Sequence, residues 1–344
     1  MFKRIRAFGV TCAILCTIMC GTVQAASVPF SDVPATAPYY NEVMYCRDKG
    51  ITSGVGNNRF APNNPVSNFE AATMILRAFQ PSLLADGKSA VDVSYFNGWI
   101  ESWNYANPYG QITLSDLINL SLRAKGLYNY CGNAMETAVD MGLYKAGENG
   151  ARVAKRSDCA YLIGKLAVNT YTPDWTKLDE KLNMVVGKEF EGERIDYYVA
   201  ASGLPDAVLS KWDASGNILE VSLEAMSRYT GGDVYPFYVG MYYGKGIVLI
   251  TPYSMYHEFG HYIHYTSAYK DLKSKVSALF VKYKDEVDAV LGDYAASNEE
   301  EFFAECFSSY MGEVMESATR ADLKEKMPDV FNLLADMEAT NWGV

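Results

Sequence analysis

Apolar residues recur with a helical period along the first half of the chain, and glycine-containing turns separate the periodic segments. Polar residues lie in the first turn of most of these segments, as is typical of helix N-termini. The pattern predicts four principal helices, over residues 40–50, 66–78, 112–124 and 154–166. This part of the chain is therefore expected to be all-α.

Acidic residues mark the start of the last three predicted helices at a nearly regular spacing. Glu70, Asp116 and Asp158 lie 46 and 42 residues apart. A period of this length predicts stacked supersecondary units that bury their apolar faces only together. We expect an all-α domain over residues 26–170, built from three units at about 28–80, 84–126 and 127–169.

Three short motifs in the first unit precede its second helix: Phe-Ser-Asp-Val at 30–33, Gly-Val-Gly at 54–56 and Phe-Ala-Pro at 60–62. Together with the helix start at 66–70, they make this unit resemble an S-layer homology repeat. In that family, triplets of the repeat hold proteins to anionic polymers of the bacterial cell wall, and an arginine contributes to binding. The resemblance therefore implies a cell-wall polymer as one partner.

The residues at the arginine position differ among the three units. Asn68, Leu114 and Arg156 stand there, so only the third unit keeps the charge. Anion recognition by this motif depends on the fork of donors on a guanidinium group. Two interpretations stay open: a wall-binding domain, or a packing module that orients or protects the second domain.

The second half begins after a segment without apolar periodicity, Asn169 to Asp174, which suits a domain boundary. Upstream of residue 250 a glycine-rich region ends in four β-favouring residues, Ile247 to Ile250, which predict a strand. At a sheet edge, such a strand could pair with an extended peptide. Ser254 is expected to cap a helix from Tyr256 to about Thr266.

All three histidines of the chain fall in that predicted helix, as His257, His261 and His264. Residues four apart share one helix face, so His257 and His261 can both bind one Zn²⁺ at about 2.0 to 2.1 Å. Glu258 then has the position of the proton-accepting glutamate in the His-Glu-x-x-His motif of zinc metallopeptidases. His264 lies three residues beyond His261, so we expect it to have a structural or outer-shell role.

A third ligand is required because catalytic zinc sites usually have three protein ligands. The acidic stretch from Ser297 to Glu305 is the candidate, and Ser297 with Glu300 has the spacing of a capping box. Glu301 and Glu305 lie one turn apart on the same face, which suits one ligand and one outer acceptor for an imidazole N–H. The alternative is an acidic helix start in solvent, favoured by the helix dipole.

Residues 256–261, Tyr294 and residues 297–305 together resemble the catalytic domain of anthrax lethal factor and its relatives, which include bacterial Pro-Pro endopeptidases. The resemblance covers about residue 231 to the C-terminus. It implies a mainly helical zincin-like domain with a small sheet, and hence an α+β fold for the chain, with this domain over residues 171–344. It also implies Glu301 as the third zinc ligand and the Tyr294 hydroxyl as a donor to the developing oxyanion. His264 departs from the lethal factor pattern, which has an acidic residue there.

The N-terminus has the pattern of a secretory signal peptide over residues 1–25: basic residues, an apolar run from Phe8 to Cys20, and small residues Val23 and Ala25. A lipid-modified Cys20 is the alternative. No later apolar run has the 18 or so residues of a membrane span, so the mature chain is expected to be soluble and exported. Removal of the signal leaves 27 basic and 41 acidic residues, a net charge of −14, which argues against nucleic acid as a partner.

Four cysteines remain after this cleavage: Cys46, Cys131, Cys159 and Cys306. This number excludes a dense disulfide scaffold. Isolated buried thiols are the favoured interpretation, and a bridge between Cys131 and Cys159 is the alternative.

These observations predict a secreted or cell-surface zinc-dependent endopeptidase that hydrolyses internal peptide bonds of protein substrates. The expected cofactor is one Zn²⁺, and the expected partners are a peptide or protein substrate and a cell-wall polymer bound by the repeats. The alternative is a catalytically inactive wall-associated binding or structural protein that keeps the zincin fold.

Overall fold

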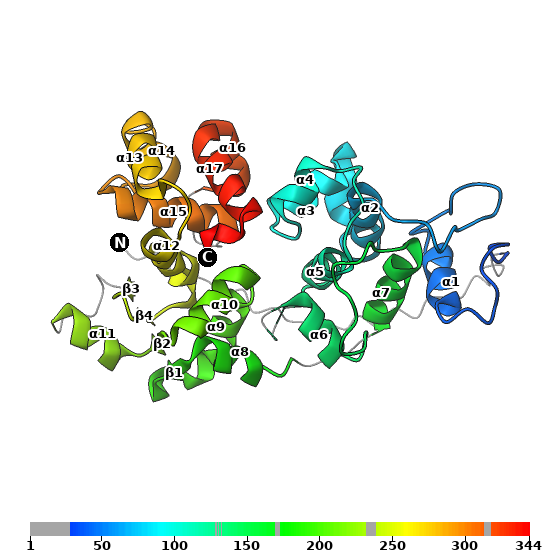
Figure 1. Cartoon of the computed structure of the whole chain (residues 1–344), viewed down its shortest axis with the longest axis horizontal. Coiled ribbons are helices and arrows are strands. Elements are labelled where there is room, and N and C mark those ends of the chain that lie inside the picture. Colours follow the sequence, from blue (N-terminus) through cyan, green and yellow to red (C-terminus); the bar gives the residue numbers. More distant parts are fainter. Residues whose placement is uncertain are drawn as a thin grey trace, which may run out of the picture.

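The computed structural model describes residues 28–127, 129, 131, 133–168, 173–231, 239–312 and 318–344. The signal peptide predicted over residues 1–25 lies outside the described residues. Within the described ranges, no helix has both the length and the apolar character needed to cross a membrane. Figure 1 shows two groups of elements, the repeat half (residues 28–168) and the C-terminal half (residues 173–344).

Helices make up the repeat half, as the periodicity predicted, and all four principal helices are present as α1, α2, α5 and α7. Additional short helices lie between them. The elements are α1 (Tyr40–Asp48), α2 (Asn68–Phe79), η1 (Pro81–Gly87), α3 (Ala90–Phe96), α4 (Ser102–Ala106), α5 (Leu114–Lys125), α6 (Ala134–Asp140) and α7 (Arg156–Val168). In α5, Leu114, Leu117 and Ile118 form the buried face, and Gly126 ends the helix in a left-handed conformation, at φ 76°.

The segments that precede α2, α5 and α7 meet in a closed cycle of backbone hydrogen bonds. Val66 N–H donates to Ala154 O at 3.0 Å, Ala154 N–H donates to Ile112 O at 2.9 Å, and Ile112 N–H donates to Val66 O at 3.2 Å. All three side chains are buried. Each segment thus satisfies the backbone groups of the next, which explains why the three units pack together.

The C-terminal half combines helices with a small sheet, which confirms the α+β prediction. Its elements are α8 (Thr176–Leu182), β1 (Met184–Val186), η2 (Lys188–Glu193), α9 (Arg194–Ala201), α10 (Asp206–Ser215), β2 (Ile218–Val221), α11 (Leu223–Thr230), β3 (Gly240–Tyr242), β4 (Gly246–Leu249), η3 (Pro252–Ser254), α12 (Met255–Thr266), α13 (Leu272–Lys282), α14 (Val287–Leu291), α15 (Glu299–Met311), α16 (Arg320–Lys326), α17 (Pro328–Ala339) and η4 (Asn341–Gly343).

The sheet has four strands in the order β1-β2-β4-β3. Strands β1, β2 and β4 are parallel, and β3 runs antiparallel to β4 with Gly240 opposite Leu249. The strand predicted at 247–250 is present as β4, but it lies between two other strands. The edge position on which peptide pairing to this strand depended is therefore not observed. The short antiparallel strand β3 forms the edge on that side, and its pairing was not visible in the local pattern.

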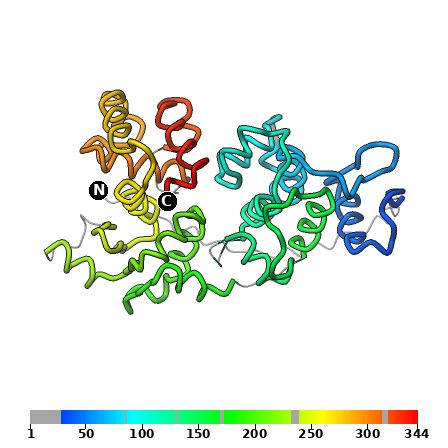
Figure 2. Tube along the Cα trace, in the orientation of Figure 1, coloured from blue at the N-terminus to red at the C-terminus, as the bar shows by residue number. Residues whose placement is uncertain are grey.

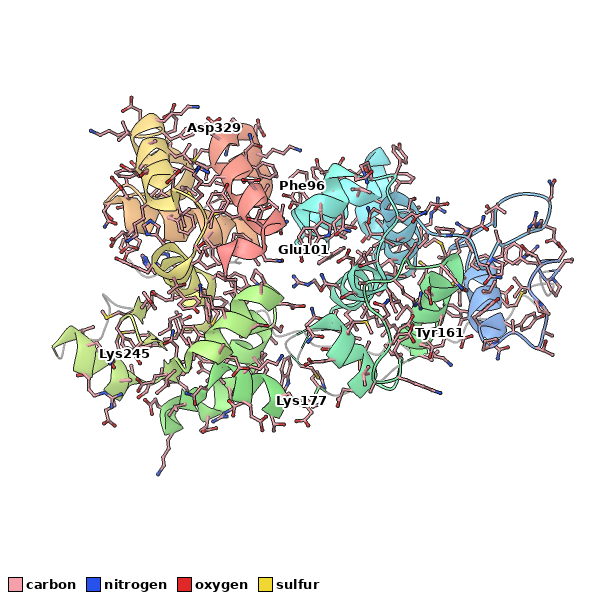
Figure 3. All side chains as sticks on the ribbon, in the orientation of Figure 1. Phe96, Glu101, Tyr161, Lys177, Lys245 and Asp329 are labelled. Atoms are coloured by element: carbon pink, nitrogen blue, oxygen red, sulfur yellow. The ribbon has the colours of Figure 1, made fainter. Side chains whose placement is uncertain are left out.

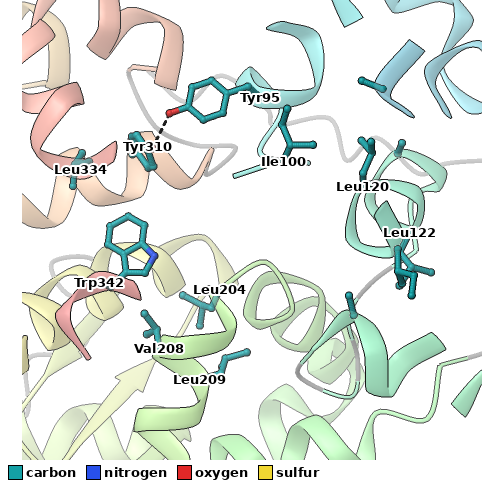
Figure 4. Close-up of a cluster of buried hydrophobic side chains, with 14 of the residues drawn as sticks. Tyr95, Ile100, Leu120, Leu122, Leu204, Val208, Leu209, Tyr310, Leu334 and Trp342 are labelled. Atoms are coloured by element: carbon teal, nitrogen blue, oxygen red, sulfur yellow. Dashed lines mark hydrogen bonds between the residues drawn. The ribbon is translucent and has the colours of Figure 1, made fainter. Parts of the chain in front are cut away.

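The two halves contact each other through α3 and α4 on one side and the last helices on the other. Figure 2 shows the C-terminal helices, in red, next to the cyan segment of the repeat half. The Tyr95 and Tyr310 hydroxyls share a hydrogen bond of 2.8 Å, drawn in Figure 4. Glu338 accepts bonds from Ser102 N–H and from Tyr310 O–H, both at 2.8 Å. One buried core therefore continues across the junction.

All four described cysteines are buried, and none of them forms a disulfide within the described part of the chain. This confirms isolated thiols as the correct interpretation, and the alternative bridge between Cys131 and Cys159 was wrong. Burial raises the pKa of the Cys46 thiol to about 12, with a smaller contribution from the nearby charge of Glu42. Such thiols pack as small apolar groups.

Candidate metal centre

Helix α12 carries the histidines, and its apolar residues explain how they are oriented. Met255, Phe259 and Ile263 are fully buried on the core side, which directs His257 and His261 together towards α15. The helix begins at Met255, directly after the 3-10 turn Pro252–Ser254. Ser254 stands at the N-cap position but its side chain makes no capping hydrogen bond, so that prediction was wrong.

Helix α15 begins at Glu299 and is capped by Asn298. The Asn298 side-chain oxygen accepts hydrogen bonds from Glu300 N–H at 2.9 Å and from Glu301 N–H at 3.0 Å. The N-cap therefore lies one residue beyond the predicted Ser297, and the capping box predicted for Ser297 and Glu300 was wrong. Both residues can cap a helix, and the extended backbone of Asn298 decides between them.

Three potential ligand atoms converge between α12 and α15. His257 Nε2 and His261 Nε2 lie 3.1 Å apart. Glu301 Oε2 lies 3.1 Å from the first and 3.2 Å from the second. Ligand atoms held about 2.0 to 2.1 Å from a tetrahedral ion are about 3.3 Å from one another. The triangle formed by His257, His261 and Glu301 therefore has the size that a zinc ion requires.

The Glu301 oxygen provides a second test of the fit. Its Oε2 atom is buried and makes no hydrogen bond of good geometry with any residue that the structure describes, although two ring nitrogens lie within 3.2 Å. Buried carboxylate oxygens normally have a hydrogen-bond donor. This arrangement is expected if the lone pairs of the two ring nitrogens and of the Glu301 oxygen point at one common position. A cation bound there would then pair with all three atoms.

Glu305 lies on the opposite side of the His257 ring. Its Oε1 atom is 3.1 Å from His257 Nδ1, so one imidazole has a carboxylate at each nitrogen. Burial opposes protonation of His257, but the neighbouring carboxylates of Glu301 and Glu305 outweigh it and raise the pKa of the imidazole well above its usual value. An outer carboxylate of this kind fixes the ring orientation and the tautomer of a metal-binding histidine.

The charge of Glu301 is strongly stabilised by the two histidines. Burial alone would raise the pKa of this carboxyl, but the contacts with His257 and His261 lower it overall. The carboxylate is therefore ionised at neutral pH, as a metal ligand must be.

Glu258 is buried next to the triangle and is not one of its corners. Only 4% of the residue is exposed. Burial raises the pKa of its carboxyl, whereas His257 and His261 lower it to a smaller extent. The backbone of strand β3 lies against this carboxylate, at Gly240 and through a hydrogen bond with Tyr242. Glu258 is thus held beside the metal position and close to the sheet edge.

Tyr294 lies at the rim of the site, with 56% of its surface exposed. Its ring centroid is 5.7 Å from that of His257. Partial burial and the neighbouring charge of Glu301 raise the pKa of the phenol, so the hydroxyl keeps its proton at neutral pH. The group is positioned to donate a hydrogen bond into the site.

His264 lies away from the triangle. It is buried and stacks on Phe303, with ring centroids 5.2 Å apart. Neither ring nitrogen has a hydrogen-bond partner among the described residues, and burial lowers the pKa of the imidazole. The structure therefore brings His257, His261, Glu301, Glu305, Glu258 and Tyr294 together and excludes His264. The contributions of Gly240 and Asn298 to the site were not identified from the sequence. Gly240 makes room for Glu258, and Asn298 caps the helix that carries Glu301.

Comparison with known proteins identifies two segments. The S-layer homology domain family matches residues 29–72. The family described as anthrax toxin lethal factor, N- and C-terminal domain, matches residues 246–337. The second match contains both helices of the candidate metal centre, and no solved structure matches the chain significantly.

Two relatives have names that describe them as surface proteins. A surface-layer 125 kDa protein of Lysinibacillus sphaericus is 30% identical over 116 residues, which cover 34% of this chain and 9% of that protein. A cell surface protein of Thermoanaerobacter kivui is 27% identical over 251 residues, which cover 61% of this chain and 31% of that protein. The chain thus spans less than a third of either relative.

The two family matches confirm the architecture predicted from the sequence to the extent that an S-layer homology segment precedes a lethal factor-like segment. The repeat match and the two relatives support association with the cell surface or the S-layer. The chain therefore combines an S-layer homology domain with an anthrax lethal factor-like domain in one cell-surface-associated protein.

Proposed function

We propose that this protein is a zinc-dependent endopeptidase that hydrolyses internal peptide bonds of protein substrates at the cell surface. The convergence of His257, His261 and Glu301 on one point is the observation that carries the proposal. In this assignment residues 171–344 perform catalysis and residues 26–170 determine where the protein acts. A zinc ion held by these three ligands would supply a Lewis acid and would lower the pKa of a water molecule to about 7.

The protein groups around the ligands have separate roles. Glu258 accepts a proton from the attacking water and delivers it to the leaving amine, a role typically worth about 10²- to 10⁴-fold in rate. Its burial favours the neutral form and so brings its basicity closer to that needed at neutral pH. Tyr294 O–H donates a hydrogen bond to the developing oxyanion, and loss of one such donor typically costs about 10²-fold or more.

Two further residues support the ligands. Glu305 accepts a hydrogen bond from His257 Nδ1–H, so that Nε2 is the nitrogen that can bind the metal. His264 fills the α12–α15 contact against Phe303 and has a structural role.

Strand β3 offers the position for the substrate backbone. It is paired on one side only among the described strands, and its Gly240 lies against Glu258. An extended peptide can add to such an edge through main-chain hydrogen bonds. A substrate bound there would pass directly beside the catalytic carboxylate.

The test compares wild-type protein with Glu258→Gln. We expect Glu258→Gln to bind one zinc ion per chain and to lose cleavage of a diverse peptide library by about 10²-fold or more. Glu325→Gln, a change at an exposed position of helix α16, is the matched control and should cleave like wild type. Full turnover by Glu258→Gln overturns the assigned base, and zinc binding without any cleavage by wild type supports the inactive alternative.

The alternative is a catalytically inactive wall-associated protein, and the names of the two relatives favour it. Wall binding by the repeats has a specific obstacle. Only one of the three units keeps an arginine at the motif position, and the structure shows what that arginine contacts. Arg156 is buried and donates to Phe60 O at 2.9 Å and to Glu70 Oε1 at 3.1 Å. This guanidinium is occupied within the fold, so its contribution to polymer binding requires that the pair with Glu70 opens.

Binding to purified cell wall separates the two roles of the repeats. A wall-binding domain would retain the protein on wall fragments, and Arg156→Lys would weaken that retention because lysine lacks the guanidinium fork. A packing module would leave wild-type protein in solution. The second outcome agrees with the extensive contact between the repeat half and the C-terminal helices.

A further inference from the structure

Gly240 in strand β3 has no space for a side chain. A Cβ atom built there would lie 2.6 Å from Glu258 Oε1, 2.8 Å from Glu258 Cγ and 3.0 Å from Glu258 Cδ. Distances below about 3 Å between a Cβ and another heavy atom are steric clashes, because carbon atoms in contact stay about 3.5 to 4.0 Å apart. The Glu258 carboxyl group thus occupies the volume that any other residue at 240 would fill.

The backbone conformation gives no separate reason for glycine at this position. Gly240 is absent from the residues with positive φ, whereas the neighbouring Gly244 has φ 84° and forms the turn between β3 and β4. A non-glycine residue could therefore adopt the backbone of Gly240. The requirement is one of space alone.

Alternation along β3 explains why position 240 faces the helix. Successive residues of a strand point to opposite faces. Met241 packs with the small cluster of Ala225, Met226 and Val248. The ring of Tyr242 lies on the other face, 6.0 Å from the ring of Tyr262 on α12. Gly240 shares the face of Tyr242, so a side chain at 240 would point directly at α12 and Glu258.

We propose that Gly240 is a positioning residue for the catalytic base: by lacking a side chain, it admits the Glu258 carboxyl group between strand β3 and the metal ligands. This inference deepens the proposed peptidase function and rests on it for the role of Glu258. The packing relationship itself is independent of catalysis. A methyl group at 240 would displace the carboxylate, and a displacement of about 1 Å in a catalytic group can cost about 10²-fold in rate.

The first experiment measures packing in the metal-free protein through a double-mutant cycle of Gly240→Ala and Glu258→Ala. The three heavy atoms nearest to a Cβ at 240 all belong to the Glu258 side chain, and Glu258→Ala removes them. We expect Gly240→Ala to lower the melting temperature by several degrees in the wild-type background and to have little effect in the Glu258→Ala background. An equal decrease in both backgrounds overturns the inference, because the clash would then involve another group.

The same cycle remains informative if Gly240→Ala does not fold. Recovery of soluble, folded protein in the double variant supports the inference, and failure of both variants contradicts it. Gly192→Ala is the matched control, because Gly192 has no atom within 4 Å of its Cβ position and no positive φ. Gly192→Ala should leave the melting temperature nearly unchanged.

The second experiment measures turnover of a cleaved peptide at saturating zinc. We expect Gly240→Ala to keep one zinc ion per chain and to lower kcat by about 10²-fold, while Gly192→Ala retains wild-type kcat. Unchanged kcat in Gly240→Ala overturns the positioning role. If wild-type protein cleaves no peptide, the proposed peptidase function fails, whereas the stability cycle still decides whether Gly240 makes room for Glu258.

Discussion

Gly260 on α12 lies against the backbone of Ala304 on α15. A Cβ atom at position 260 would be 2.8 Å from Ala304 Cα and 3.2 Å from Ala304 O. Gly260 lies between the two histidine ligands in the sequence, and Ala304 lies between Glu301 and Glu305. This close contact of the two helices therefore lies next to the residues of the candidate metal centre. The absence of a side chain at 260 sets the spacing that lets a carboxylate of α15 reach both imidazoles.

Gly260→Ala should destabilise the protein and weaken zinc binding. In an ordinary helix interior this change would stabilise the fold by about 1 kcal/mol. Here the methyl group would force the two helices apart, and overpacking of this kind typically costs about 1 to 3 kcal/mol. Urea denaturation of the metal-free protein gives the stability, and competition with a zinc-chelating dye gives the affinity.

The sign of the stability change makes this test decisive. Gly192→Ala provides the control, because its Cβ position is empty and the residue is exposed. A gain in stability for Gly260→Ala would show that the helices are not held at contact distance.

Glu305→Ala should weaken zinc binding without removing a ligand. Glu305 Oε1 is 3.1 Å from His257 Nδ1 and so fixes the ring that presents Nε2 to the metal. Loss of an outer partner of this kind typically costs about 10- to 100-fold in metal affinity. The zinc dissociation constant, measured by dye competition, should rise accordingly. Glu325→Ala on α16 is the control, and an unchanged constant for Glu305→Ala would exclude the orienting role.

Local patterns were sufficient for the four principal helices of the repeat half, for α12 and for part of the site. The spacing of His257 and His261 needs only helical geometry, so α12 brings them together whatever surrounds it. The helices that open at Asn68, Leu114 and Arg156 follow in the same way from periodicity and polar starts. These features depend on residues close in sequence.

Features that depend on distant segments were not predictable. Strand β4 was identified, but its partners β2 and β3 come from both sides of α11, so its interior position is a property of the whole sheet. Glu301 was assigned by family resemblance, because no spacing rule connects α12 with α15. The space required at Gly240 and the stacking of His264 on Phe303 likewise arise only when distant elements meet.

Arg320→Met should strongly destabilise the junction between the two halves. Arg320 is buried between the rings of Tyr95 and Tyr310, at 4.6 and 4.0 Å from their centroids. It donates to Tyr310 O at 2.6 Å and to Tyr95 O at 3.2 Å, and its Nη2 atom lies 3.8 Å from Glu338 Oε1. Removal leaves buried acceptors and a carboxylate without their cation, a change that typically costs about 3 to 5 kcal/mol.

Urea denaturation provides the measurement for Arg320→Met. Lys326→Ala in the same helix is the control, because Lys326 pairs with Asp322 in an exposed i,i+4 contact that contributes little. A loss for Arg320→Met no larger than that for Lys326→Ala would contradict a structural role for this contact.

Glu101→Gln should make the junction less sensitive to alkaline pH. Glu101 and Asn97 lie on the face of the repeat half that meets the C-terminal helices, and Figure 3 labels Glu101 there. Burial, the charge of Glu338 and a hydrogen bond with it raise the pKa of the Glu101 carboxyl well above its usual value, while Arg123 and Arg320 act in the opposite direction.

A raised pKa in the folded state means that the folded protein holds this proton more tightly than the unfolded chain does. Its contribution to stability is therefore complete below the ordinary glutamate pKa and is lost as the pH rises through the raised value. Glutamine keeps a hydrogen-bonding amide and cannot ionise next to Glu338, so melting temperatures of Glu101→Gln should exceed those of wild type at pH 8 and approach them towards pH 5. Glu325→Gln, which lies on the surface, should follow the wild-type profile. Parallel curves for wild type and Glu101→Gln would show that Glu101 ionises as freely in the folded protein as in the unfolded chain.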